Sequence, residues 1–219
     1  METAHSAGTL YIVVDDRFHN ILIDPLPETI TVKGRDFLIN TDFRAGMLFE
    51  MLSNDSTMSD EDIALQTLDI FMTDGIPDDI EATYKEILWF YRCGYEPQPK
   101  RRRRGAAVEK TAIEQRVFDY DIDAPLIYAA FMSQYHVDLQ DIEHLHWWKF
   151  TAMFQGLHES ERICEIMGYR SMDLGKITDK ELRKHYASLK NKYALPNGLS
   201  VEEKISRAGS VFAGGLGNG

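Results

Sequence analysis

Apolar side chains recur at helical spacing through most of this 219-residue chain. Seven stretches place apolar residues at every third or fourth position, the period of amphipathic α-helices. Candidate caps support several boundaries: Ser59 and Asp123 precede helices, Thr178 and Glu181 form a capping box, and Gly94 fits a left-handed C-terminal cap. The predicted helices span about 42–52, 59–72, 78–93, 123–135, 141–155, 159–167 and 178–193.

Strand-like patterns are confined to the N-terminal part of the chain. Thr29–Val32 and Phe37–Ile39 flank Lys33 and Gly34, and glycine supplies the positive φ that a tight hairpin turn requires. Leu10–Val14 is a further candidate strand. The predicted fold class is therefore mainly α, with a small N-terminal β-hairpin followed by helical bundle domains.

Composition divides the chain into segments. The stretch after Tyr95 lacks apolar periodicity and carries prolines and five consecutive cations, which is typical of a linker. The Gly-rich C-terminal end is expected to be flexible. The predicted organisation is a disordered or variable lead-in (1–19), an N-terminal domain with the hairpin and about three helices (20–95), an Arg-rich linker (96–117), a C-terminal helical domain (118–197) and a flexible tail (198–219).

The predicted helix 141–155 is unusual because it is apolar on two opposite sides. At about 100° per residue, Trp148 lies on one side, whereas Trp147, Phe150 and Phe154 lie nearly opposite. Two opposed apolar stripes indicate burial from two directions. The second stripe needs a covering surface, either the preceding helices or another protein, so these three residues are the candidate partner-binding site.

The sequence carries no motif that identifies a metal site, a cofactor or a catalytic centre. On a helix, His144 and His146 would point about 200° apart and could not share an ion. Asp119, Asp121 and Asp123 alternate as in a calcium loop, but the glycine and distal glutamate of that motif are absent. We therefore expect no catalytic residues, no bound metal, no cofactor and no enzymatic activity.

Charge is unevenly distributed along this acidic chain, whose net charge is −11. Residues 1–94 hold 18 acids and 6 bases, whereas residues 169–197 hold 3 acids and 7 bases. The N-terminal half should repel nucleic acid and tolerate a basic partner. The basic run consists of Lys100, Arg101, Arg102, Arg103 and Arg104. It could contact phosphates, but it lacks interleaved aromatic residues, and a solvated linker explains it better.

Cellular location is constrained by three absences in the sequence. Cys93 and Cys164 lack metal-binding or disulfide-framework spacing, which fits a reducing compartment. No apolar run is long enough to span a membrane, and residues 1–8 do not resemble a secretory signal. We expect a protein of the bacterial cytoplasm that has no membrane partner.

Six ordered motifs resemble one bacteriophage family. The chain resembles the family called gene product fifteen, found in siphophages and prophages of Gram-positive bacteria, and the likeness covers about Ile21 to Asn197. The motifs are Asp24–Pro27, Ile39–Arg44, Leu88–Gly94, Leu145–Phe150, Met167–Leu174 and Tyr193–Pro196.

The resemblance implies a role in building the long phage tail. Genes of this family resemble those of tail assembly chaperones, which keep the helical tape measure protein soluble until tail-tube subunits polymerise around it. The implied partners are the tape measure protein and other tail assembly proteins, with a homo-oligomer also compatible, and the implied location is the host cytoplasm. Two alternatives stay open: a structural tail component retained in the virion, and a nucleic-acid-binding regulator acting through Lys100–Arg104.

Overall fold

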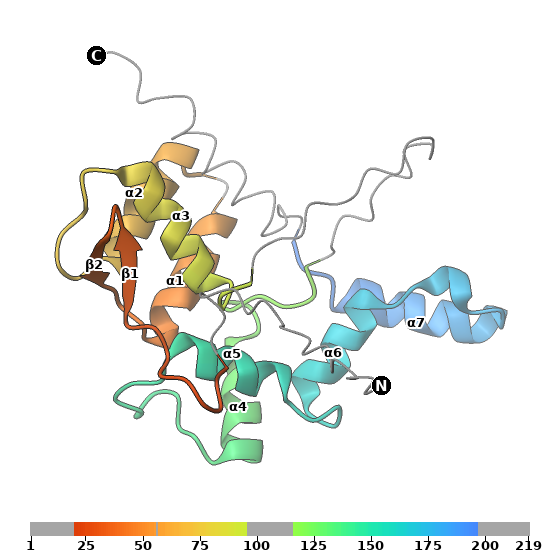
Figure 1. Ribbon diagram of the computed structural model, residues 1–219. Coiled ribbons are helices and arrows are strands. Elements are labelled where there is room, and N and C mark those ends of the chain that lie inside the picture. The colour runs from red at the N-terminus through yellow and green to blue at the C-terminus, as the bar shows by residue number, and fades with distance from the viewer. Residues whose placement is uncertain (1–19, 56, 96–115, 197–219) are drawn as a thin grey trace, which may run out of the picture.

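The computed structural model describes residues 20–55, 57–95 and 116–196 (Figure 1). The expectations for the lead-in, for the strand at 10–14, for the basic run and for the tail fall outside these residues. Within them the chain is mainly helical, with one small hairpin, as predicted. The elements are β1 (Thr29–Val32), β2 (Arg35–Leu38), α1 (Phe43–Asn54), α2 (Asp60–Phe71), α3 (Ile80–Tyr91), α4 (Ala124–Tyr135), α5 (Trp147–Gln155), α6 (Arg162–Ser171), the 3-10 turn η1 (Leu174–Lys176) and α7 (Lys180–Lys192).

The hairpin covers one side of α3. Strands β1 and β2 are antiparallel, with Val32 paired to Arg35 across the turn. Lys33 and Gly34 both adopt positive φ, at 50° and 75°, as a two-residue hairpin turn of the primed type requires. Ile30 and Val32 alternate with exposed residues and are 1% and 3% exposed, so β1 turns one apolar face toward α3.

Helices α1, α2 and α3 form the N-terminal lobe around a chain of aromatic rings. Each helix begins at a side-chain cap: Asp42 accepts from the Arg44 amide, Ser59 from the Asp62 amide and Asp79 from the Ala82 amide. Inside the lobe, Phe71 makes edge contacts with Phe49 and Phe90, at centroid distances of 6.2 and 6.1 Å.

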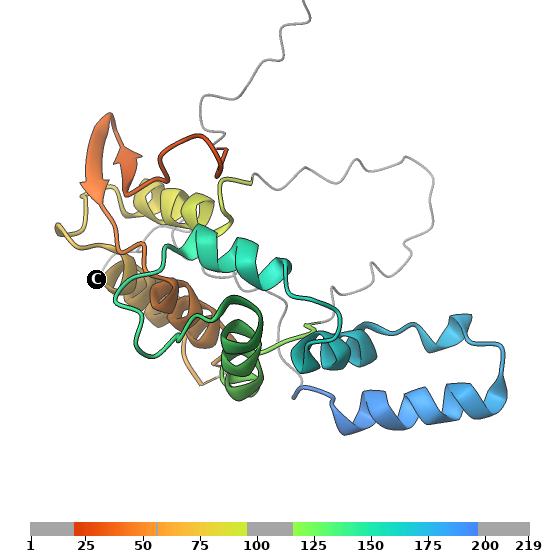
Figure 2. The same cartoon turned by 90° about the horizontal axis from the view of Figure 1, so that it is seen from below.

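Helix α5 is the central element of the molecule. It lies between the N-terminal lobe and helices α4 and α6 (Figure 2). One hydrophobic cluster runs from Ile30 on β1 through α5 to Ile163 on α6. Segments 20–95 and 118–197, predicted as two domains, therefore do not have separate cores.

The predicted helix 141–155 begins only at Trp147. The residues before it pair with the segment that enters α1: the Trp147 amide donates to Thr41 O at 2.7 Å, and the Phe43 amide donates to Leu145 O at 2.8 Å. A backbone amide committed to a distant carbonyl cannot donate to the residue four positions earlier, so the helix cannot extend toward residue 141. Tertiary pairing overrides the local periodicity here.

A buried ion pair fastens α6 to the start of α4. The Arg170 guanidinium donates to both carboxylate oxygens of Asp123, at 2.6 and 3.0 Å, and both side chains are at most 5% exposed. Arg170 also donates to Val117 O and Tyr193 O, so it satisfies carbonyls from two further segments. Asp123 occupies the N-cap position of α4 as predicted, but it makes no side-chain cap bond because Arg170 engages its carboxylate.

The C-terminal helices differ from prediction in three respects. Helix α6 continues through Gly168 to Ser171. Helix α7 is capped by Asp179, which accepts from the Leu182 amide, and not by Thr178. Helical periodicity places Leu182, Tyr186, Leu189 and Tyr193 on one apolar stripe and predicts that this stripe is buried, yet α7 contains no buried residue and Leu182 is 48% exposed. Helix α7 packs mainly on α6 and η1 and extends away from the rest of the fold (Figures 1 and 2).

Within the described residues, no helix is long and apolar enough to cross a bilayer.

Gly46 on α1 provides a test of the packing between α1 and α5. A Cβ atom at Gly46 would lie 2.3 Å from the Trp147 ring, whereas a Cβ at Gly168 on α6 would meet nothing within 4 Å. We expect Gly46→Ala to lower the free energy of unfolding by about 1–3 kcal/mol because a buried indole must move. Gly168→Ala should be neutral, or stabilising by up to about 1 kcal/mol, because alanine favours helix. Chemical denaturation of both variants compares them; equal stability of the two would contradict this packing.

Candidate partner-binding pocket

The C-terminal end of α3 is shaped by two consecutive left-handed residues. Cys93 and Gly94 have φ values of 55° and 78°, and the Gly94 amide returns to Trp89 O at 3.0 Å. The last carbonyls of a helix lack intrahelical donors. Here the Trp147 indole donates to Tyr91 O and the Trp148 indole to Phe90 O, each at 2.8 Å. The adjacent tryptophans of α5 therefore bind the end of α3.

The candidate partner-binding residues Trp147, Phe150 and Phe154 are 3%, 0% and 8% exposed. The Trp147 ring stacks on Tyr91 at 5.3 Å, and Phe154 meets Phe118 at 5.0 Å. Phe150 is stacked between the rings of Phe43 and Phe131, at 5.1 and 4.9 Å. The second apolar side of α5 is thus covered by preceding segments of the chain itself, which is the first of the two alternatives that the sequence left open.

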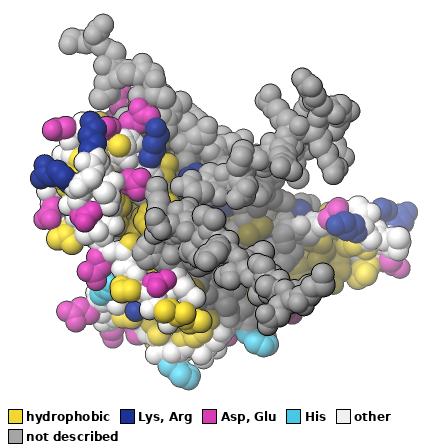
Figure 3. Space-filling model, viewed as in Figure 1, with side chains coloured by type: hydrophobic (Ala, Val, Ile, Leu, Met, Phe, Trp, Pro, Cys, Tyr) yellow, Lys and Arg dark blue, Asp and Glu magenta, His cyan; other side chains and the backbone are white. Residues whose placement is uncertain are grey.

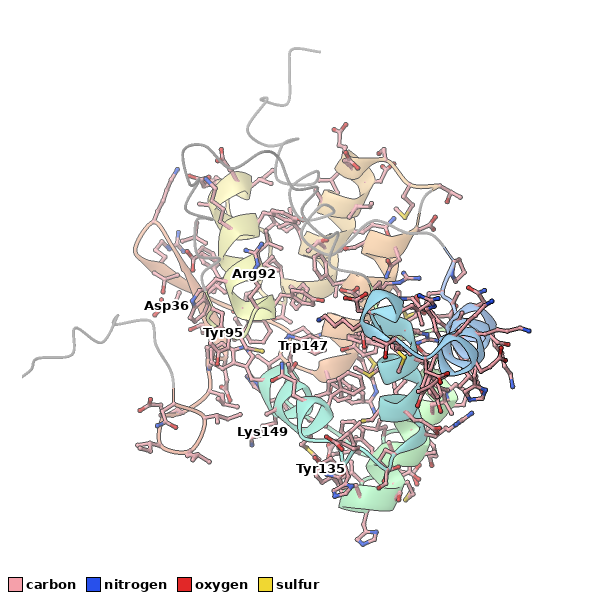
Figure 4. All side chains as sticks on the ribbon, turned by 90° about the vertical axis from the view of Figure 1, so that its right-hand side faces the viewer. Asp36, Arg92, Tyr95, Tyr135, Trp147 and Lys149 are labelled. Atoms are coloured by element: carbon pink, nitrogen blue, oxygen red, sulfur yellow. The ribbon has the colours of Figure 1, made fainter. Side chains whose placement is uncertain are left out.

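A cavity of about 770 Å³ opens beside this aromatic layer. Trp147 and Phe154 line it, but Phe150 does not. Trp147 lies between the end of α3, marked by Arg92 and Tyr95, and α6 (Figure 4). The remaining lining comes mainly from Asn20 and Ile21, the α3 end at 91–95, Phe118 and Tyr120, α5 residues including Thr151 and Ala152, and the α6 residues Cys164 and Met167.

The lining favours binding over proton or nucleophile chemistry. Burial raises the pKa of the Cys93 thiol to about 11 and also raises the pKa of Cys164. Burial, reinforced by the Glu50 carboxylate, raises the pKa of Tyr91, whose hydroxyl donates to Glu50 at 2.5 Å. These thiols and this phenol stay protonated at neutral pH and are poor nucleophiles. Among the described lining residues there is no carboxylate and no imidazole.

His144 and His146 have separate structural roles. His144 Nε2 lies 3.1 Å from Thr41 Oγ1. His146 is the N-cap of α5: its Nδ1 accepts from the Trp148 amide at 3.1 Å, and its Nε2 lies 3.1 Å from Pro27 O. Together these two contacts assign the neutral tautomer with the proton on Nε2. No group of three or more potential metal ligands occurs among the described residues.

Several pocket residues could not be identified from periodicity. Tyr91, Cys93 and Tyr95 surround the end of α3, and Cys164 and Met167 belong to α6, which is about 70 positions away in sequence. The sequence signals were the Leu88–Gly94 motif, which covers the α3 end, and the Met167–Leu174 motif, which includes Met167. The basic run Lys100–Arg104 lies outside the described residues.

The fold and the pocket together define a small helical protein with an aromatic, largely uncharged binding cavity. The family model for the bacteriophage Gp15 protein matches residues 22–195. The chain therefore belongs to the bacteriophage Gp15 family, and it is a phage protein. No curated protein and no solved structure matches the chain.

Truncation of either tryptophan tests whether both rings belong to the core. We expect Trp147→Ala and Trp148→Ala each to lower the free energy of unfolding by about 3–5 kcal/mol, since each removes a buried ring and an indole hydrogen bond to an α3 carbonyl. Tyr95 is 72% exposed, so Tyr95→Ala should change the free energy of unfolding by no more than about 0.5 kcal/mol. Unchanged stability of Trp147→Ala in urea denaturation would contradict the packing seen here.

The His146 cap makes stability depend on pH. Burial lowers the pKa of His146 below its ordinary value of 6.5. The unfolded state then binds the proton more readily, so the full stabilisation is present above pH 6.5 and is lost as the pH falls toward the lower folded-state pKa. Protonation of Nδ1 would also remove the acceptor for the Trp148 amide.

Unfolding free energies measured between pH 7.5 and 5.5 should therefore decline more steeply for the natural chain than for His146→Asn. Asparagine can cap the helix but does not titrate in this range. Parallel declines in the two proteins would exclude His146 as the titrating group.

Proposed function

We propose that this chain is a phage tail assembly protein that binds the tape measure protein in the pocket beside Trp147 while the tail forms in the host cytoplasm. Membership of the Gp15 family supports a role in phage. The observation that carries the binding proposal is the cavity of about 770 Å³ lined by aromatic, methionine and thiol side chains. Such a lining suits apolar side chains projecting from one face of an amphipathic helix.

The composition of the lining supports a binding role over a catalytic one. Met167 is an adaptable apolar side chain, and the rings of Trp147 and Phe154 offer rigid apolar surface. Residues 20–95 hold 15 acids and 5 bases, which would speed the approach of a basic client. A chaperone needs reversible contact with an apolar segment, and an apolar lining without a reactive group suits such contact.

Ala152 allows the pocket to be blocked without disturbing the core. Its side chain is exposed and lines the cavity, whereas Lys149 is exposed on the same helix but does not line the cavity (Figure 4). Ala152→Glu places a charge in the apolar opening, and Lys149→Glu is the matched control. Both variants should retain the melting temperature of the natural chain within a few degrees because surface changes cost little.

Co-expression with the tape measure protein of the same phage provides the measurement. The natural chain and Lys149→Glu should raise the soluble fraction of tape measure protein several-fold over an empty vector, whereas Ala152→Glu should not. If the tape measure protein is equally soluble without this chain, the chaperone proposal fails. If Ala152→Glu keeps as much tape measure protein soluble as the natural chain does, this pocket is not the binding site.

A further inference from the structure

Helix α7 contains no buried residue, although it is 13 residues long. Its apolar stripe is only partly covered: Tyr193, just beyond its C-terminus, stacks on Tyr169 of α6 at 5.9 Å, whereas Leu182 near the other end is 48% exposed. Isolated helices of this length are marginal in water, and most helices are stabilised by packing of an apolar face. The exposed end of the stripe is therefore a candidate contact surface.

The charge of α7 specifies the kind of partner. The helix carries five cations and one acid, Glu181. Two of the cations, Lys190 and Lys192, lie in the last turn, where they complement the helix dipole. The other three lie toward the positive end of the dipole, where cations are unfavourable: Lys180, Arg183 and Lys184. An anionic surface against this half of α7 would offset that repulsion. In Figure 3, Lys and Arg side chains lie beside hydrophobic ones on the projecting part that holds α7.

Helix α2 presents the complementary pattern on the same chain. It carries four acids and no base within Asp60–Phe71. Three exposed residues follow one another at four-residue spacing: Glu61, Leu65 and Asp69. This spacing places them on one stripe of the helix, with Leu65, which is 42% exposed, between the two acids. Helices α2 and α7 lie at opposite ends of the fold, so they cannot meet within one molecule (Figure 1).

We propose that α7 of one copy of this chain docks on the α2 face of a second copy. Leu182 would pack near Leu65, with Arg183 and Lys184 facing Glu61 and Asp69. Because the two surfaces are different, the contact is heterologous, and its repetition gives a ring or an open chain of copies. Contacts between exposed charges are screened by salt, so assembly should weaken as ionic strength rises.

Charge reversal tests both surfaces in the full-length chain. Sedimentation velocity at tens of micromolar and low salt should show species heavier than the 25.1 kDa monomer, and these should decrease in high salt. Arg183→Glu with Lys184→Glu, and separately Glu61→Lys with Asp69→Lys, should each weaken self-association at least tenfold. The control Arg35→Glu with Lys149→Glu changes the net charge as much as the α7 variant, away from both surfaces, and should assemble like the natural chain.

Mixing the two reversed variants gives the decisive result. Each then offers the other an oppositely charged surface, so the heavier species should return in the mixture although neither variant forms them alone. Circular dichroism confirms that both variants are folded. No tape measure protein is present, so the outcome is independent of the chaperone proposal.

The proposal is overturned if the natural chain is monomeric at every concentration and salt. It is equally overturned if the α7 reversal leaves assembly unchanged, or if the mixture does not assemble. Hydrogen exchange tests the alternative that residues 197–219 of the same chain cover α7. If the α7 amides of the monomer lose protection when residues 197–219 are removed, that segment covers α7, and the second copy does not.

Discussion

Two indole N–H groups join α5 to the end of α3 by donating to the terminal carbonyls of that helix. The last carbonyls of α3 have no donors within their own helix, and Trp147 and Trp148 supply donors from more than 50 positions further along the chain. This arrangement fixes α5 across the N-terminal lobe, requires glycine at position 46 beneath the Trp147 ring, and leaves the pocket beside the left-handed turn at Cys93 and Gly94. The position of α5, the close contact with α1 at Gly46 and the place of the cavity are thus all related to one capping arrangement.

Local physics predicted most of the fold. Ser59 caps α2 through its hydroxyl, Gly34 forms the hairpin turn and helical periodicity located all seven α-helices of the described residues, because each signal acts within a few residues. The first failure was at 141–146, where the segment 41–43 claims the backbone groups that a helix would need. The second was at α7, where an apolar stripe exists but no partner within the described residues buries it. Periodicity shows which side is apolar and does not show what lies against it.

The candidate site was only partly accessible to the same reasoning. The two opposed stripes of α5 did indicate burial from two directions, and the large rings on both sides are buried, Trp148 on one and Trp147, Phe150 and Phe154 on the other. The sequence could not decide whether Trp147, Phe150 and Phe154 faced a partner, because Tyr91, Phe131 and Phe118 approach them only in the folded chain. The pocket is an outcome of that convergence: Trp147 and Phe154 keep an edge on it, and Phe150 does not.

Tyr95 and Phe118 both line the pocket, so the chain segment that joins them begins and ends at the same cavity. Chain length alone then limits how far Lys100 can lie from Tyr95. Five residues span at most about 18 Å when fully extended. Covalent connection to Tyr95 therefore sets an upper limit on the distance between Lys100 and the pocket opening, whatever path the chain takes after Tyr95.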